Sequence, residues 1–351
     1  MVLFDYGNTR LRARISTLQP FEKLESFAEL TSIDSYLSTL TKTPYKESIE
    51  TALTFAHGYA CLSQAMRIEL ANVVEDLRRF YQDPEAKLVN IIFMRDDLLN
   101  LKTIVRGLTH EIPFDEIIDS FQSLGAISLV YLRELAKAKN LDDMVNKMLV
   151  FQLPSAQALL KLRSSKEQPT SSDAELALER YFFQEIKELL KGNSENISLL
   201  REFYAVDADT INLNLVLQAI NSPEKFENLA IKKYIFAQGN LSHRVLLRLS
   251  KESSVEEVIR SLLSTKYGVF LRRGLDCYTD THLLSEFENQ MQMYLLKWLS
   301  KLPKLFPLGI GVPLGYYAIK RTEIFNLRWI GKGIASGFEV SYIKENLMRI
   351  Q

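Results

Sequence analysis

The sequence has few of the residues that mark secreted, metal-binding or membrane-spanning proteins. Its only two cysteines, Cys61 and Cys277, lie too far apart to suggest a disulfide framework or a zinc site, and we expect both to be buried thiols. Residues 1–14 lack the apolar core of a signal peptide. The longest uncharged stretch, 305–319, contains prolines and glycines and falls short of the ~20 apolar residues that cross a bilayer. The sequence therefore predicts no secretion and no membrane span.

Net charge is also missing. The 351 residues carry 43 Lys and Arg against 43 Asp and Glu, so no long-range field attracts phosphates or anionic lipid. This balance disfavours nucleic acid as a partner. The hydrophobic fraction of 47% and the charged fraction of 25% are those of an ordinary globular protein, and the length favours two or three domains.

Motifs of catalysis and cofactor binding are absent as well. The sequence contains no Walker A motif, no GxSxG elbow and no HExxH pair. Only His57 and Cys61 are spaced to share a metal, and two ligands do not make a site. Gly309, Gly311 and Gly315 miss the dinucleotide-binding spacing, so a closely packed loop is the better interpretation. We expect no catalytic residues, no cofactor and no metal.

What the sequence does contain is helical periodicity from end to end. Apolar residues recur at i, i+3, i+4 and i+7, and almost no stretch alternates with a period of two. The pattern predicts an all-α fold. Proline, glycine and short polar runs predict loops at 82–84, 164–173, 192–196, 221–223 and 303–313.

One short pattern occurs three times, at offsets of 112 and 114 residues. An acid is followed three residues later by Asn-Leu, then by a β-branched residue, and a small residue ends the pattern. The acid, the asparagine and the small residue are Asp97, Asn100 and Gly107, then Asp209, Asn212 and Ala219, then Glu323, Asn326 and Gly333.

A second block repeats at nearly the same offsets and predicts two consecutive short helices. The first helix has paired apolar residues, and the second begins at a residue type that prefers the N-cap position, followed by an acid two residues on. The predicted N-caps are Ser32, Asn140 and Ser254, and the apolar pairs are Leu24 with Phe27, Leu132 with Leu135, and Leu246 with Leu249.

Two repeated blocks at matched spacing predict three copies of one helical unit. The period is too long for a common solenoid repeat, so each copy is expected to be a small helical bundle of domain size. We place the copies at about 1–118, 119–229 and 230–351.

The repeated acids and asparagines have two interpretations. They lie one turn apart on the same helix face, as catalytic carboxylates would, yet recurrence in every copy favours a role in holding helices together. A mid-helix asparagine lowers helix propensity, which indicates a buried hydrogen bond or a partner contact. The small residues permit close helix approach or a helix end.

Five cations are candidates for a partner interface. Arg10 and Arg14 share a helix face, where like charges repel mildly unless an acid faces them. Arg106, Arg328 and Lys332 follow the repeated asparagines. Each of the five is either a solvated charge or a contact to another protein.

These segments carry a resemblance to a known family. The stretch 323–333, EIFNLRWIGKG, preceded by the Pro-Leu-Gly-Tyr of 313–316, resembles the C-terminal signature of the C subunit of V/A-type ATPases, the counterpart of the eukaryotic d subunit. Residues 100–107, 6–13 and 265–271 are similar to further segments of that family. The middle copy departs most, with Asn214 and Gln218 where the other copies carry Lys or Arg.

The resemblance implies a non-catalytic subunit that works in ATP synthesis or in ion transport, including hydrogen ion transport. Three bundles would form a funnel with pseudo-threefold symmetry, seated on the proteolipid rotor ring at the cytoplasmic face of the membrane, and the central stalk would insert into it. The subunit would transmit torque between stalk and ring without binding nucleotide or ion. Two alternatives stay open from the residues themselves: a helical scaffold or adaptor of another complex, and an all-α enzyme whose site has no motif.

Overall fold

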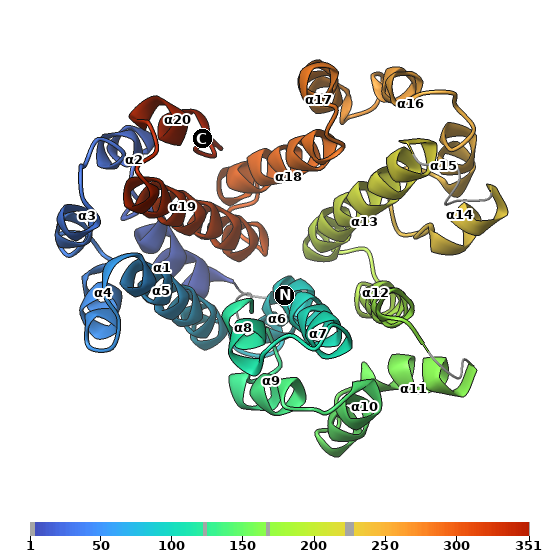
Figure 1. Cartoon of the computed structure of the whole chain (residues 1–351), viewed down its shortest axis with the longest axis horizontal. Helices are drawn as coiled ribbons and strands as arrows, with labels where there is room; N and C mark the ends of the chain where they lie inside the picture. Colours follow the sequence, from blue (N-terminus) through green and yellow to red (C-terminus); the bar gives the residue numbers. More distant parts are fainter. Residues whose placement is uncertain (1–3, 122–124, 166–168, 222–227, 351) are drawn as a thin grey trace. The chain divides into compact units, whose positions relative to one another are not determined.

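The computed structural model describes residues 4–121, 125–165, 169–221 and 228–350, and within these ranges every regular element is a helix, as the periodicity predicts. Figure 1 shows their order along the chain. The first ten are α1 (Asp5–Ile15), α2 (Phe21–Phe27), α3 (Ile33–Leu40), α4 (Lys46–Leu53), α5 (Gly58–Phe80), α6 (Glu85–Ile92), α7 (Met94–Thr109), α8 (Phe114–Asp119), α9 (Leu129–Ala136) and α10 (Leu141–Val150). The others are α11 (Ala156–Ser165), α12 (Ser171–Leu189), α13 (Glu195–Asn221), α14 (Asn228–Tyr234), α15 (His243–Leu249), α16 (Val255–Leu262), α17 (Gly268–Thr281), α18 (Ser285–Leu305), α19 (Gly311–Ser336) and α20 (Val340–Glu345).

The helices gather into two compact units. The first combines residues 1–90 with 296–351, and the second comprises residues 91–295. In Figure 1 the blue helices α1 to α5 accordingly lie with the red helices α19 and α20, although these segments are at opposite ends of the sequence. The first unit is therefore built from both ends of the chain.

The core of the first unit forms where α19 crosses the N-terminal helices. Its buried side chains come from α2, α3, α4 and α5 on one side and from α19 and α20 on the other. Among the fully buried members are Tyr36, Leu62, Leu327 and Ile330. Because this apolar surface leaves water only when both ends of the chain meet, neither end can bury its share alone.

The second unit includes an apolar core around α13. Side chains of α13 pack against α15, α16 and α17 and against the first part of α18. Leu213, Leu246, Ile259 and Phe287 are fully buried there. The other helices of this unit pack in the order α7, α9, α10, α11 and α12.

The predicted N-caps and apolar pairs are confirmed. The side chains of Ser32, Asn140 and Ser254 each accept a hydrogen bond from the backbone N–H three residues later, at the start of α3, α10 and α16. These bonds satisfy N–H groups that have no partner inside the helix. All six residues of the predicted apolar pairs are buried.

Several expectations need correction. The predicted loop at 164–173 overlaps α11, which ends at Ser165, and α12, which begins at Ser171, and the one at 192–196 ends where α13 begins at Glu195. Residues 222–223 of the loop predicted at 221–223 lie outside the described residues. The predicted loop at 303–313 is shorter, because α18 continues to Leu305 with Pro303 inside it and α19 begins at Gly311. Cys61 is buried as expected, but Cys277 is exposed on α17. Cys277 occupies a helix that is amphipathic, and single-residue hydrophobicity does not say on which face it lies.

Among the described residues, no helix is both long and apolar enough to span a bilayer. The three-copy boundaries at 1–118, 119–229 and 230–351 stay a prediction. What the structure does show of the repeats is their local geometry.

Candidate partner interface

Each repeated acid lies inside a long helix and accepts backbone hydrogen bonds from another segment. Asp97 of α7 is buried and accepts from the N–H groups of Ala126 and Ile127, at 2.6 and 3.0 Å. These amides stand directly before Ser128, the N-cap of α9. The carboxylate thus holds the chain at the point where the next helix pair begins.

Asp209 of α13 makes the same arrangement. It accepts from the N–H groups of Asn240 and Leu241, both at 2.9 Å, directly before the N-cap Ser242 of α15. The hydroxyl of Tyr267 also donates to Asp209 at 2.6 Å. Burial raises the pKa of Asp209, although these hydrogen bonds act in the opposite direction.

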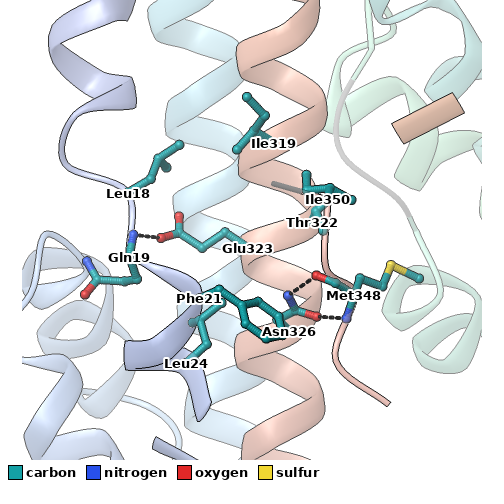
Figure 2. Close-up of a pocket in the computed structure, with 10 residues that line it drawn as sticks. All are labelled: Leu18, Gln19, Phe21, Leu24, Ile319, Thr322, Glu323, Asn326, Met348 and Ile350. Carbon is teal, nitrogen blue, oxygen red and sulfur yellow. Dashed lines mark hydrogen bonds between the residues drawn. The ribbon is translucent and has the colours of Figure 1, made fainter. Parts of the chain in front are cut away.

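Glu323 of α19, near the C-terminus, makes the corresponding contact with a segment near the N-terminus. It accepts from the N–H of Gln19 at 2.5 Å, directly before the N-cap Pro20 of α2 (Figure 2). It also accepts from the hydroxyl of Tyr45. Lys320 lies 3.2 Å from Glu323 and 3.1 Å from Glu69. This third copy therefore contains a buried ionic cluster at its repeated acid.

Tyr45 and Tyr267 are equivalent, because each follows the N-cap of the preceding helix by 13 residues. Burial raises the pKa of both phenols, and the nearby carboxylates of Glu323 and Asp209 raise it further. Both tyrosines are therefore neutral hydrogen-bond donors. At the same spacing after Asn140 the chain carries Leu153, so the site of Asp97 has no phenol.

The repeated asparagines pair with the backbone. Asn212 donates to the carbonyl of Phe236 and accepts from its N–H, both at 2.8 Å. Asn326 donates to the carbonyl of Met348 at 3.0 Å and accepts from its N–H at 2.8 Å (Figure 2). Asn100 is fully buried at the corresponding position of α7. Asn212 and Asn326 thus each satisfy the N–H and the carbonyl of one backbone residue in the segment that packs against the helix.

The small residues at the end of the pattern allow close packing. A Cβ on Gly107 would lie 2.4 Å from the Ile117 side chain, and one on Gly333 would lie 2.6 Å from Ile343. Ala219 is buried where the other copies have glycine. The three acids thus hold the segments that lead into α9, α15 and α2, and Asn212 and Asn326 hold a further backbone residue near α13 and α19.

A pocket opens beside the Glu323 and Asn326 contacts (Figure 2). Its walls are mainly apolar, and Glu323 and Asn326 are engaged by Gln19 and Met348. The described residues hold no cluster of ligands suited to a metal ion. The lining residues are Leu18, Gln19, Phe21, Leu24, Ile319, Thr322, Glu323, Asn326, Met348 and Ile350.

Of the candidate interface cations, the two N-terminal ones contact their own unit. The guanidinium of Arg10 lies over the rings of Tyr6 and Phe80, at 4.6 and 5.4 Å from their centroids. Arg14 forms an ion pair with Asp76 at 2.7 Å, with about half of its side chain exposed. Asp76 is therefore the acid that offsets the mild repulsion between Arg10 and Arg14, which share one helix face.

The three cations that follow the repeated asparagines differ from one another. Arg106 makes a two-pronged bond to Glu175 of α12, at 2.7 and 2.5 Å. Arg328 and Lys332 of α19 are exposed, and the structure gives neither an ion pair nor a hydrogen bond within its described part. Of the five candidates, these two are the ones whose charges no described residue of the chain engages.

The sequence alone does not indicate the charged cluster between α7, α12 and α13. Arg95 is paired with Glu179, whose other oxygen lies 2.8 Å from Lys102, and Arg95 also lies 3.3 Å from Asp207. Burial opposes ionisation of Glu179, but the charges of Arg95 and Lys102 outweigh it and lower its pKa. Burial raises the pKa of Asp207, which has less compensation. Of these residues only Lys102 lies at a position of the repeated pattern, and nothing in the sequence indicates that Glu179 would meet it.

Comparison with known proteins agrees with the resemblance noted from the motifs. The family model described as ATP synthase (C/AC39) subunit matches residues 7–346. The chain is similar to the C subunit of the A-type ATP synthase of Methanocaldococcus jannaschii, with 24% identity over 99% of this chain and 86% of that protein.

Two further relatives carry the same description. The C subunit of the A-type ATP synthase of Methanobrevibacter smithii is 26% identical, over 96% of this chain and 86% of the relative. That of Haloquadratum walsbyi is 22% identical, over 98% of both chains. The similarity thus extends along the whole length of the chain.

Proposed function

The chain belongs to the ATP synthase (C/AC39) subunit family, and from this we propose that it is the coupling subunit that connects the central stalk of a rotary V/A-type ATPase to the proteolipid ring. In this role it transmits torque for ATP synthesis or ion transport. It works at the cytoplasmic face of the membrane, and the nucleotide and ion sites belong to other subunits. The expectation of a non-catalytic subunit agrees with the family.

The observation that carries the proposal is the family match from residue 7 to 346, together with whole-length similarity to the C subunits of A-type ATP synthases. The sequence segments that carry the resemblance are also the ones that build the buried acid and asparagine contacts. These contacts favour a part that transmits force, because buried hydrogen bonds and ion pairs resist sliding of one helix along the next.

The funnel with pseudo-threefold symmetry is part of the proposal. It is supported by the three long helices α7, α13 and α19, each of which carries an acid, an asparagine and a small residue at the same spacing. In α7 and α13 the acid binds amides about thirty residues ahead, and in α19 it binds an amide at the other end of the chain. A pattern that closes on itself through the termini fits a cyclic arrangement of three units.

The test is a comparison of the complete ATP synthase with the same complex lacking this chain. We expect the detached head to hydrolyse ATP at an unchanged rate, while ion movement that depends on ATP is lost. Adding back the purified chain should restore ion movement. The measurement pairs a phosphate-release assay with an ion-flux assay in proteoliposomes.

A complex that still pumps ions without the chain would overturn the coupling role. Loss of hydrolysis by the detached head would assign the chain to catalysis instead. Co-purification with a different set of proteins, and not with stalk and ring, would favour the scaffold or adaptor alternative.

A further inference from the structure

One face of α19 carries an exposed pair of cations beside an exposed aromatic ring. Phe325, Arg328 and Lys332 are spaced at i, i+3 and i+7, so they form one stripe along the helix. Phe325 is 44% exposed, although most of α19 around this stripe is buried. Because both charges lack an intramolecular partner in the described part of the chain, the stripe is available to another molecule.

The repeat shows what the same positions do in α7. Counting from the repeated asparagine, Lys102 corresponds to Arg328 and Arg106 corresponds to Lys332. In α7 both cations are neutralised by α12, where Lys102 lies 2.8 Å from Glu179 and 3.6 Å from Glu175.

The two acids of α12 are spaced to meet both cations of α7. Glu175 and Glu179 are four residues apart, so a single helix presents both carboxylates on one face to the cations of α7. The bond from Arg106 to Glu175 is two-pronged and is accompanied by a lowered pKa of the carboxyl, since its hydrogen bonds and the charges of Arg106 and Lys102 outweigh burial. In α7, the face that carries the two cations therefore binds a helix of the same chain that presents two carboxylates.

The described part of the chain supplies no such acids to the stripe on α19. The longest helix that packs on α19 is α5, and its residues 58–68, which include the contact of Leu62 with Gly331, contain no aspartate or glutamate. Its first acid, Glu69, is engaged by Lys320 instead. In α13 the corresponding positions are Asn214 and Gln218, which need no counter-charge. Of α7, α13 and α19, α19 is thus the helix that has both cations but no carboxylate from the described part of the chain paired with them.

We propose that the stripe of Phe325, Arg328 and Lys332 binds a helix of a central-stalk subunit of the complex, and that this helix presents two carboxylates four residues apart beside an apolar side chain. The inference rests on the proposed function in taking the partner to be a subunit of the same ATP synthase, and it adds the chemistry of the contact. Aromatic and arginine side chains together are typical of the centre of protein interfaces. The contact weakens as salt screens its charges.

The experiment places the photoreactive amino acid benzoylphenylalanine at position 325 of the chain in the intact complex. Mass spectrometry of the cross-linked peptide then identifies what lies on the stripe. We expect a helical segment of a central-stalk subunit with two carboxylates four residues apart. A cross-link to a segment without this pair, to the proteolipid ring or to lipid, or no cross-link at all, overturns the inference.

Charge-reversal variants test the same contact by affinity. The double variant R328E/K332E should bind the purified central stalk at least about tenfold more weakly, because like charges oppose each other at the contact. The control K42E/K46E makes the same change in charge at exposed lysines of the same unit and should bind as the unaltered chain does. Replacing the two cross-linked carboxylates by lysine should restore binding to R328E/K332E.

The outcomes separate this inference from the proposed function. If R328E/K332E and the neutral variant R328Q/K332Q bind the stalk as tightly as the control, with all variants melting at the same temperature, the stripe is a solvated surface and the coupling role is unaffected. If the chain does not co-purify with the ATP synthase, the proposed function fails. A cross-link from position 325 formed in whole cells then still shows whether an acidic helix occupies the stripe.

Discussion

At the level of single residues, the repeated asparagines show how hydrogen bonds compensate for a residue with low helix propensity. Asparagine is a poor residue for a helix interior. In α13, however, Asn212 supplies both the acceptor and the donor that the backbone of Phe236 needs in a buried position. The free energy lost in helix propensity, about half a kcal/mol, is smaller than the cost of leaving two backbone groups unpaired.

This comparison predicts the effect of removing the side chain. Asn212→Ala should lower the free energy of unfolding by about 2 to 4 kcal/mol, because the N–H and the carbonyl of Phe236 lose their partner. The measurement is a urea titration followed by far-UV circular dichroism. Asn214→Ala, the same change two residues away at a half-exposed position, should alter stability by no more than about 0.5 kcal/mol. Equal losses in the two variants would contradict a role for the hydrogen bonds.

A glycine directly precedes the two backbone amides that each repeated aspartate binds, and this glycine gives a second prediction. A Cβ on Gly239 would lie 2.1 Å from Oδ1 of Asp209, and one on Gly125 would lie 2.2 Å from the Asp97 carboxylate. Gly239→Ala should therefore cost roughly 1 to 3 kcal/mol of stability by overpacking.

A double-mutant cycle provides the control for Gly239→Ala. In an Asp209→Ala background the atoms that the new Cβ meets are gone, so Gly239→Ala should cost much less there. The measurement is again the urea midpoint. If Gly239→Ala costs the same in both backgrounds, the strain arises somewhere other than at the carboxylate.

At the level of helices, charged pairs decide how α7 and α12 pack. Glu179 is 4% exposed and contacts both Arg95 and Lys102, so its carboxylate is ionised in an environment that would otherwise disfavour charge. The contact between α19 and α5 is different, since apolar residues and Gly331 form its centre and the ionic cluster of Lys320 lies beside them. Equivalent helices in one chain are therefore joined by different chemistry.

The charge on Glu179 predicts a pH dependence. Because its pKa is lower in the folded than in the unfolded state, its stabilising effect is complete above the unfolded pKa of about 4.3 and is lost as the pH falls through the lower folded value. Glu179→Gln should cost about 3 kcal/mol at pH 7, since it leaves buried cations with weaker partners.

The difference between the two proteins should shrink as the pH falls below about 4. The measurement is chemical denaturation of both proteins at a series of pH values. The raised pKa of Asp207, due first to burial, works in the opposite direction; because the charge of Glu179 is one of its causes, this effect is smaller in Glu179→Gln. A difference that stays constant down to about pH 3 would contradict the lowered pKa.

At the level of the complete chain, the two termini are parts of one folded unit. The core of that unit takes side chains from 24–66 and from 324–347, which the sequence separates by more than 250 residues. A long loop closure has an entropic cost, but that cost grows only slowly with length, so an extended core offsets it. The second unit, 91–295, is continuous in sequence and contains its own buried core.

This architecture predicts the behaviour of fragments. The fragment 91–295 should unfold cooperatively by itself, whereas 1–90 should be poorly folded until 296–351 is added, because its core lacks Leu327 and Ile330. Circular dichroism and thermal melting of the separate and mixed fragments are the measurement. Both tryptophans, Trp298 and Trp329, belong to 296–351, so their emission reports the complementation directly. Cooperative unfolding of 1–90 alone would contradict the shared core.

The local structure of this protein follows from its sequence alone. Helical periodicity predicted the all-α fold, and the N-caps at Ser32, Asn140 and Ser254 are confirmed, because both depend on residues within one or two turns. The triple recurrence of acid and asparagine marked positions that are all buried, and hydrogen bonds to the backbone are seen for the three acids and for Asn212 and Asn326. The use of the exposed pair Arg328 and Lys332 as an interface remains a prediction.

The meeting of distant groups, by contrast, depends on tertiary packing. The sequence did not indicate that Glu323 binds the amide of Gln19, that Arg106 is engaged by Glu175, or that Cys277 faces solvent. The physical reason is that a charge or a thiol fits either a solvated or a buried face, and the choice depends on which helix packs against it. That packing is fixed by burial of the whole apolar surface, a property of the complete chain and not of any one segment.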